Sequence, residues 1–262
     1  MIPISVFIIA KNEADRIAPI IQAVKDFADE ILVIDSNSTD QTQKISLENG
    51  AKVFNNDWKG FGQQKIFGEN LCRNQWILNI DADEEVSKEL SQEIIKIFQH
   101  EIAEDIAGFR IKIVNKFRFE IKPKKYAYFY NQLRLYRKDL AGFKNSLVHD
   151  SVELKSPDNF KILQLKNIIY HQSFRSFNHW IDKINSYSSL QASEAFLKNK
   201  NSSYLKVFLS PILAFFKAYF VRRYFIYGLN GLTYSLIFAF SRFAKAIKTR
   251  ELFTENNNNK HE

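Results

Sequence analysis

The order of apolar and polar positions in the first hundred residues predicts alternating strands and helices. Short continuous apolar runs bounded by polar breaks are typical of buried strands, and they occupy residues 4–10, 30–34, 52–55 and 76–80. Helical spacing or capping signals predict helices over residues 14–27, 39–49, 63–71 and 87–100. Strands that alternate with helices in this way predict βαβ units and a mostly parallel, Rossmann-like sheet flanked by helices, which is an α/β fold.

The predicted helix over residues 39–49 has a signal at each end. Ser38 precedes it, with Gln41 three residues further on, which predicts Ser38 as the N-cap of a capping box. Gly50 follows it, in the position where a left-handed residue commonly ends a helix.

After residue 100 the pattern changes from helical spacing to period two. This alternation predicts half-exposed strands, some of them antiparallel, at residues 108–114, 132–137 and 151–154. A long helix is predicted over residues 177–198, and the asparagine run at residues 256–259 indicates a frayed end.

The composition is that of a folded protein with an uneven charge distribution. Apolar residues make up 45% of the chain, which argues against disorder. The net charge is +8, but it is concentrated in one section, because residues 195–250 contain ten Lys or Arg and no Asp or Glu. The rest of the chain holds the other 27 of the 37 basic residues and all 29 acidic residues, so it is nearly neutral. The single cysteine, Cys72, excludes an internal disulfide and suits a reducing compartment. No signal-peptide pattern opens the sequence, so a cytoplasmic protein is expected.

Three of the predicted strands end in polar loops, at residues 11–13, 35–40 and 81–85. In a doubly wound sheet these carboxyl ends meet at one edge, where they would form a crevice lined by acids. An acidic crevice repels bare phosphates, so a phosphate-bearing ligand would need a divalent cation. The pattern therefore predicts a nucleotide-diphosphate ligand bridged by Mg²⁺ or Mn²⁺. Glycine-rich dinucleotide and P-loop motifs are missing from the sequence.

Asp81 and Asp83 follow the fourth predicted strand, two residues apart. If the chain stays extended there, both carboxylates leave the same side of the backbone and offer hard oxygen ligands for such a cation. The alternative is a solvated acidic turn at the N-terminus of the helix that starts near Ser87.

Four segments in order carry a family resemblance: Ile8-Ile-Ala-Lys-Asn-Glu-Ala14, Val33-Ile-Asp-Ser-Asn-Ser-Thr-Asp40, Gly60-Phe-Gly-Gln-Gln-Lys65 and Leu78-Asn-Ile-Asp-Ala-Asp-Glu-Glu-Val86. This set resembles family-2 glycosyltransferases of the GT-A fold. Further segments are similar to the lipopolysaccharide-core branch, which adds glucose to the inner core: Arg134-Leu-Tyr-Arg137, Val148-His-Asp150, Tyr170-His171, Lys183-Ile-Asn-Ser-Tyr-Ser188 and Tyr227-Gly-Leu-Asn-Gly231.

The resemblance implies a donor site for a UDP-type sugar. Asp35 would hydrogen-bond the uracil or ribose, with Asn12 and Glu13 near the same nucleoside. Asp81 would contact the ribose or the metal shell, and Lys65 would lie near the donor. The plainer alternatives are a turn-forming aspartate at Asp35 and a solvated surface lysine at Lys65.

The resemblance also implies metal ligands and a general base for an inverting transfer. Asp83 would ligate Mg²⁺ or Mn²⁺, and His171 would be a third ligand or a diphosphate contact, although a lone histidine is more often structural. Asp150 would take the proton of the acceptor hydroxyl. It stands where the branch usually has Glu, and Glu153 is the alternative base.

Two other classes of protein remain open from the residues alone. A nucleotidyltransferase acting on sugar phosphates also uses paired acids, but it would normally carry a glycine-rich basic loop near its N-terminus. A nucleic-acid-binding protein would suit the basic, aromatic C-terminal section. We favour the enzyme and expect no nucleic-acid partner.

The expected domains are a GT-A catalytic domain over residues 1–175, a basic helical extension over 176–255, and a disordered tail over 256–262. Within the first domain, residues 1–100 would bind the nucleotide and residues 101–175 the acceptor. In the extension, residues 224–241 are uncharged and residues 205–221 are nearly so. Their flanking positive charges favour helices that lie in the membrane interface rather than spanning it. This predicts peripheral attachment to the cytoplasmic face of the inner membrane, next to a glycolipid acceptor.

Overall fold

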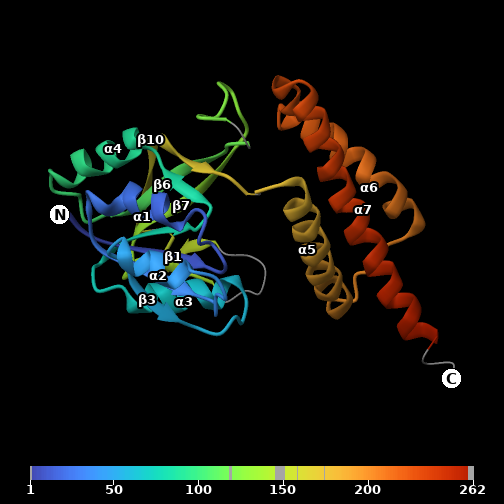
Figure 1. The fold of residues 1–262 in the computed structure, drawn as a ribbon, viewed down its shortest axis with the longest axis horizontal. Helices are drawn as coiled ribbons and strands as arrows, with labels where there is room; N and C mark the ends of the chain where they lie inside the picture. Colours follow the sequence, from blue (N-terminus) through green and yellow to red (C-terminus); the bar gives the residue numbers. More distant parts are fainter. Residues whose placement is uncertain (1, 118–119, 145–150, 158, 174, 259–262) are drawn as a thin grey trace. The chain divides into compact units, whose positions relative to one another are not determined.

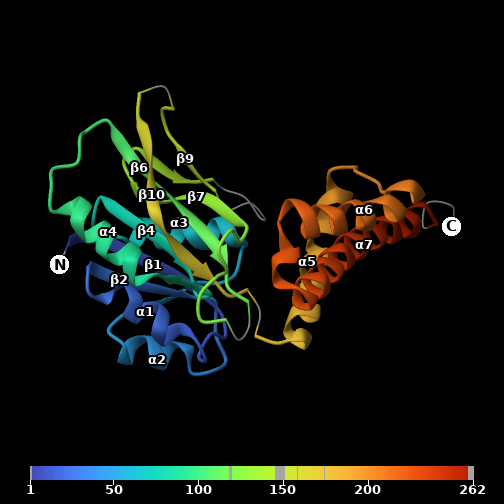
Figure 2. The same cartoon turned by 90° about the horizontal axis from the view of Figure 1, so that it is seen from above.

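The computed structural model describes residues 2–117, 120–144, 151–157, 159–173 and 175–258 (Figures 1 and 2). The chain divides into two compact units. Unit 1 comprises Met1–Lys116 and Phe129–Ser173, and unit 2 comprises Phe117–Tyr128 and Phe174–Glu262. The segment Phe117–Tyr128, which was expected in the acceptor half, therefore groups with the C-terminal helices.

Unit 1 is built on an eight-stranded sheet. In spatial order its strands are β3 (Lys52–Asn55), β2 (Ala28–Asp35), β1 (Ile2–Ala10), β4 (Trp76–Asp81), β7 (Phe129–Arg137), β6 (Ile106–Asn115), β10 (Lys161–His171) and β5 (Glu84–Val86). The β3–β2–β1–β4 half is parallel, as is the β6–β10 pair, whereas β7 and β5 run antiparallel to their neighbours. A separate two-stranded sheet joins β8 (Ala141–Phe143) to β9 (Val152–Leu154). The predicted mostly parallel sheet is confirmed.

Helices cover both faces of this sheet because alternate strand residues point to opposite sides. Val6 and Ile8 belong to a core cluster with α1 (Ile17–Lys25) and α4 (Lys88–Phe98), and α2 (Thr42–Glu48) adds partly buried Ile45. Phe7 and Ile9 belong to the opposite cluster, against which α3 (Phe61–Leu71) packs. α3 approaches β1 so closely that a Cβ on Gly68 would lie 2.6 Å from Phe7 Cδ2.

The prediction of Ser38 as a helix N-cap was wrong. α2 begins at Thr42, and its N-cap is Gln41, whose side chain makes no capping hydrogen bond. The Ser38 hydroxyl instead donates to Asp35, because the loop folds back on the end of β2. Gly50 stands just past the helix end with φ of +94°, as predicted.

Unit 2 consists of α5 (Phe177–Leu197), α6 (Tyr204–Phe216), a π turn η1 (Lys217–Val221), a 3₁₀ turn η2 (Tyr224–Tyr227) and α7 (Leu229–Asn258). α7 packs against both α5 and α6. The Phe117 ring stacks on Tyr234 with centroids 3.9 Å apart, and it meets the edges of Tyr224 and Tyr227. This aromatic cluster places Phe117 in unit 2, although it is only two residues past the end of β6.

Candidate active site

The loops after β1 and β2 are joined at the carboxyl edge of the parallel strands. Asn12 has φ of 56°, its backbone N–H donates to Ser38 Oγ at 2.8 Å, and its side-chain oxygen accepts from Thr39 N at 2.8 Å. Glu13 N donates to Thr42 Oγ1 at 2.7 Å. Carboxyl-edge loops of open α/β sheets bind ligands, and these bonds give the two loops at this edge a fixed shape.

Asp35 lies at the end of β2 and is completely buried. Its carboxylate accepts from Ser38 N at 2.8 Å, from Ser38 Oγ at 2.5 Å and from Gln43 Nε2 at 2.9 Å. The carboxylate is therefore held in one orientation by its own loop and by α2. Its contact with a nucleoside stays a prediction.

Glu13 is held by a cation that the sequence reading did not single out. The Arg16 guanidinium forms a forked ion pair with Glu13, and its Nη1 donates to the carbonyl oxygen of Gln172 at 2.7 Å. Burial alone would lower the pKa of Arg16, but Glu13 and nearby Asp83 outweigh it and raise that pKa. Arg16 thus links the loop after β1 to the end of β10.

Asp81 is clamped between two cations. Lys65 comes from α3, has no exposed side-chain surface, and places Nζ 2.9 Å from Asp81 Oδ1. Arg134 on β7 places Nη2 3.4 Å from Asp81 Oδ2. Burial favours the neutral acid, but the two cations outweigh it and lower the pKa of Asp81, so this side chain is a carboxylate at neutral pH. The solvated-surface alternative for Lys65 is excluded by its burial.

Arg134 also belongs to this site, although the sequence indicates it only as part of a segment that resembles the branch. It is 3% exposed, Nη2 lies 2.7 Å from Glu84 Oε1, and Nη1 donates to Asn79 Oδ1 at 2.7 Å. Glu84 Oε2 in turn accepts from the backbone N–H of Asp81 at 3.0 Å. One guanidinium therefore holds the strand end and the turn that follows it.

The chain does not stay extended between Asp81 and Asp83. Ala82 and Asp83 form a turn before β5, so the two carboxylates meet different partners. Asp83 Oδ2 lies 3.4 Å from His171 Nε2 at the end of β10, and Asp83 O accepts from Gln172 N at 2.9 Å. The structure thus brings the two predicted metal ligands together, while their role stays a prediction.

The pair Asp83–His171 suits a cation that is shared with a substrate. Within the described ranges, no group of three or more His, Cys, Asp or Glu side chains is arranged to hold a metal ion. A carboxylate oxygen and an imidazole nitrogen are donors that Mn²⁺ accepts, and the carboxylate suits Mg²⁺ equally well. Two protein ligands leave open positions, which diphosphate oxygens and water fill in such sites.

The predicted general base, Asp150, lies outside the described residues, as does His149. The alternative base, Glu153, lies on β9 and forms an ion pair with Lys144 at 2.5 Å. The Glu153 side chain is 47% exposed.

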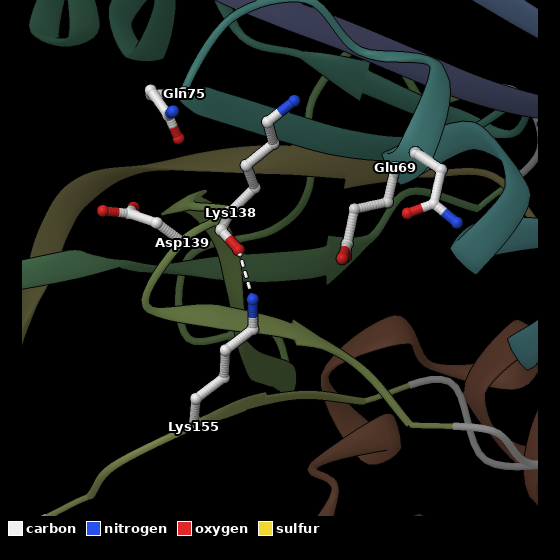
Figure 3. Close-up of a pocket in the computed structure, with 6 residues that line it drawn as sticks. Glu69, Gln75, Lys138, Asp139 and Lys155 are labelled. Atoms are coloured by element: carbon white, nitrogen blue, oxygen red, sulfur yellow. Dashed lines mark hydrogen bonds between the residues drawn. The ribbon is translucent and has the colours of Figure 1, made fainter.

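A polar recess of about 290 Å³ lies elsewhere on unit 1 (Figure 3). It is lined by Glu69, Asn70, Gln75, Lys138, Asp139 and Lys155. Gln75 precedes β4 and Lys138 follows the antiparallel β7, so the recess lies at the amino edge of the parallel strands, opposite the loops that carry Asp35 and Asp81. Lys155 Nζ donates to Lys138 O at 2.7 Å, as Figure 3 shows.

The mostly parallel sheet with helices on both faces and acidic loops at its carboxyl edge defines the class of α/β protein, and the comparisons with known proteins narrow this class. The model of the glycosyl transferase family 2 matches residues 5–157. An uncharacterized glycosyltransferase of Rickettsia felis is 44% identical over 260 residues, which is 97% of this chain and 92% of the relative. The chain belongs to glycosyl transferase family 2, and the GT-A prediction is confirmed.

More distant relatives include a lipopolysaccharide core biosynthesis glycosyltransferase of Rhizobium meliloti, which is 25% identical over 94% of this chain and 92% of the relative. This similarity supports the lipopolysaccharide-core branch. Among solved structures, the glucosyl-3-phosphoglycerate synthase of Mycobacterium tuberculosis in complex with Mn²⁺ and UDP-glucose matches 44% of this chain and 43% of its own, with 22% identity and a TM-score of 0.34.

Proposed function

We propose that this protein transfers a hexose from a UDP-type donor to a lipopolysaccharide-core or other glycolipid acceptor, with inversion at the anomeric carbon. The observation that carries the proposal is the clamped Asp81 beside the Asp83–His171 pair, at the edge where open α/β sheets bind ligands. The relative from Rhizobium meliloti, named for lipopolysaccharide core biosynthesis, supports the acceptor class.

The nucleoside end of the donor would meet the loops after β1 and β2. Asp35 accepts hydrogen bonds, so it would take one from the uracil or from a ribose hydroxyl, with Asn12 and Glu13 beside it. Asp81 would contact the ribose or the metal shell. Lys65 is buried behind Asp81 and would act on the donor through that carboxylate.

The diphosphate end would lie against Asp83 and His171. A divalent cation bound there would neutralise the charge that develops on the departing diphosphate. Asp83 and His171 would hold it, and Arg16 adds a fixed positive charge near Asp83. These residues would bind and orient the leaving group before the reaction.

The chemical step requires a base on the acceptor side. The acceptor hydroxyl oxygen attacks the anomeric carbon while its proton passes to the Asp150 carboxylate. The bond from the anomeric carbon to the diphosphate oxygen breaks, and UDP leaves with the electron pair. Because attack and departure occur on opposite faces of the sugar, the configuration inverts.

The acceptor class and the basic helices together favour peripheral attachment at the cytoplasmic face of the inner membrane. Such attachment would concentrate the enzyme where a lipid-linked acceptor is found. It would also explain why the acid-free section, residues 195–250, carries ten basic residues.

A UDP-release assay across a panel of nucleotide sugars tests the proposal. We expect release of UDP from one UDP-hexose with Mn²⁺ or Mg²⁺, acceleration by a core glycolipid, and loss of turnover in a chelator. Turnover restricted to a donor with another nucleotide would contradict the UDP assignment. Full turnover in the chelator would contradict the metal.

A further inference from the structure

Unit 2 exposes a continuous apolar stripe along α6 and η1. It consists of six side chains that are 40–67% exposed: Leu205, Phe208, Ile212, Leu213, Phe216 and Phe220. They recur mostly at intervals of three or four residues, so they share one face of the helix. The buried residues of these two elements are Ala214 and Ala218, on the other side. Large exposed apolar patches on a protein mark binding surfaces rather than ordinary solvent-facing surface.

The stripe runs between basic residues. Lys206 near the start of α6 and Lys217 at its end are exposed, as are Lys198 and Lys200 just before it. Positive charge also accumulates on the neighbouring helix: the pKa of Lys245 on α7 is lowered by burial and by the proximity of Arg242 and Lys206. An apolar face flanked by cations matches the boundary between acyl chains and anionic headgroups.

We propose that the apolar stripe inserts into the interface of an anionic lipid leaflet, with α6 lying parallel to the membrane and its flanking lysines on lipid phosphates. The biological purpose of this insertion rests on the proposed function, and the inference adds to that function the surface of unit 2 that contacts the membrane. Side chains that already face solvent can enter the leaflet without unpacking the helices.

The positive charge around the stripe favours an anionic leaflet over a second copy of the chain as the binding partner. A dimer across the stripe would place acid-free, basic segments against one another, and their like charges would repel. An anionic leaflet supplies the missing opposite charge.

A membrane span is the other arrangement open to this helix. Residues 204–221 are the one segment of the described chain long and apolar enough to cross a bilayer, with a mean hydropathy of 1.5 and 11% of the segment buried. However, 18 residues is the lower end of the required length. Lys206 and Lys217 both lie inside the segment, and Pro211 interrupts its hydrogen bonding. These features favour the interface.

The test is flotation of the full-length protein with vesicles of phosphatidylcholine, alone or with about one-third phosphatidylglycerol. Phe208→Ser with Phe216→Ser should lower the vesicle partition coefficient about a hundredfold, since each inserted phenylalanine contributes roughly a tenfold change or more. Leu47→Ser is the matched control, because Leu47 is 59% exposed on α2 of unit 1 and should leave flotation unchanged.

The charge component needs its own pair of variants. Lys206→Glu with Lys217→Glu should weaken binding to the anionic vesicles by more than about tenfold. The same change at two exposed lysines of α4, Lys88→Glu with Lys96→Glu, should have little effect.

Several results would overturn the proposal. Equal flotation of the wild type and the phenylalanine variant would remove the stripe as the contact surface. Resistance to carbonate extraction from bacterial membranes would replace it with a span. A stable dimer that the same variant dissociates, without flotation, would replace it with self-association. Donor hydrolysis measured on the same samples is independent: flotation as expected without any UDP-sugar turnover would reject the proposed function and leave the lipid surface standing.

Discussion

Lys65 Nζ lies 2.9 Å from Asp81 Oδ1, and the lysine side chain has no exposed surface. A lysine is seldom fully buried unless its charge is paired, so the ion pair and the burial depend on each other. The pair joins α3 to the end of β4 and fixes the direction of one carboxylate at the carboxyl edge of the sheet. The buried lysine therefore belongs to the site although it does not reach solvent.

Lys65→Met keeps the side-chain length and removes the charge. It should lower the free energy of unfolding by about 3 kcal/mol, because it leaves Asp81 with Arg134 as its remaining cation. Urea unfolding measures this. Lys52→Met is the control: Lys52 pairs with Glu30 at 3.3 Å but is 60% exposed, so its loss should cost less than about 1 kcal/mol. Equal losses for the two variants would contradict the buried-pair account.

Asp81 should also give the protein a specific pH dependence. Its pKa is lowered in the folded state, because Lys65 and Arg134 outweigh the effect of burial. A lowered carboxyl pKa stabilises the fold above the unfolded value, about 3.9, and this contribution is lost as the pH falls through the folded value. The stability difference between wild type and Asp81→Asn should therefore be full at neutral pH and shrink below about pH 4. A stability difference between the two proteins that grows on acidification would show that folding raises the pKa of Asp81 instead of lowering it.

Arg134→Lys should raise the KM for the donor about tenfold or more while the protein remains folded. A lysine keeps a positive charge but cannot reproduce the fork that reaches Glu84 and Asn79 together, so the turn after β4 loses its support. Arg137→Lys, three residues along the same strand, is the control, since Arg137 pairs with exposed Asp139. A fall in kcat with unchanged KM would indicate that Arg134 acts on the chemical step instead.

Asp83→Ala should abolish turnover and leave the fold intact. Removing a carboxylate in the turn after β4 costs little packing, but it deletes a proposed ligand of the diphosphate-bridging cation. Calorimetric titration with Mn²⁺ in the presence of UDP should show the binding heat lost. Glu85→Ala is the matched control, because Glu85 is two residues away and pairs with Lys116 at 3.3 Å. Unchanged turnover at controlled metal concentration would reject the assignment.

Most of the fold of residues 1–100 could be predicted from the sequence, because the patterns that determine it are local. The strand before Asp81 is a continuous apolar run, and such runs occur in buried parallel strands. The rule that the carboxyl ends of parallel strands share one edge of a sheet then predicts that the loops carrying Asn12, Asp35 and Asp81 lie together.

The contacts inside the site could not be predicted, because they join distant parts of the chain. Arg134 lies on a strand with alternating polarity, which indicates a half-exposed strand, and only the position of β7 between β4 and β6 buries it. Lys65 likewise looks like a surface residue until α3 packs on the sheet. Phe117 lies in the half of the catalytic domain that is expected to bind the acceptor, but its aromatic partners are more than a hundred residues further on, in η2 and α7.

The last prediction concerns the general base. Asp150→Asn keeps the size of the side chain but cannot accept a proton, so transfer to the acceptor should fall by at least about a hundredfold while donor binding is retained. Glu153→Gln should have a small effect, because Glu153 is 47% exposed and already pairs with Lys144. Transfer rates with a saturating acceptor, compared with UDP-sugar binding by calorimetry, separate the chemical step from binding. Normal transfer by Asp150→Asn together with loss of transfer in Glu153→Gln would move the base to β9. Asp150→Glu should retain measurable activity, because the glutamate that the branch usually has at this position keeps a carboxylate and is only one methylene longer. A purely structural role for Asp150 does not predict this retention.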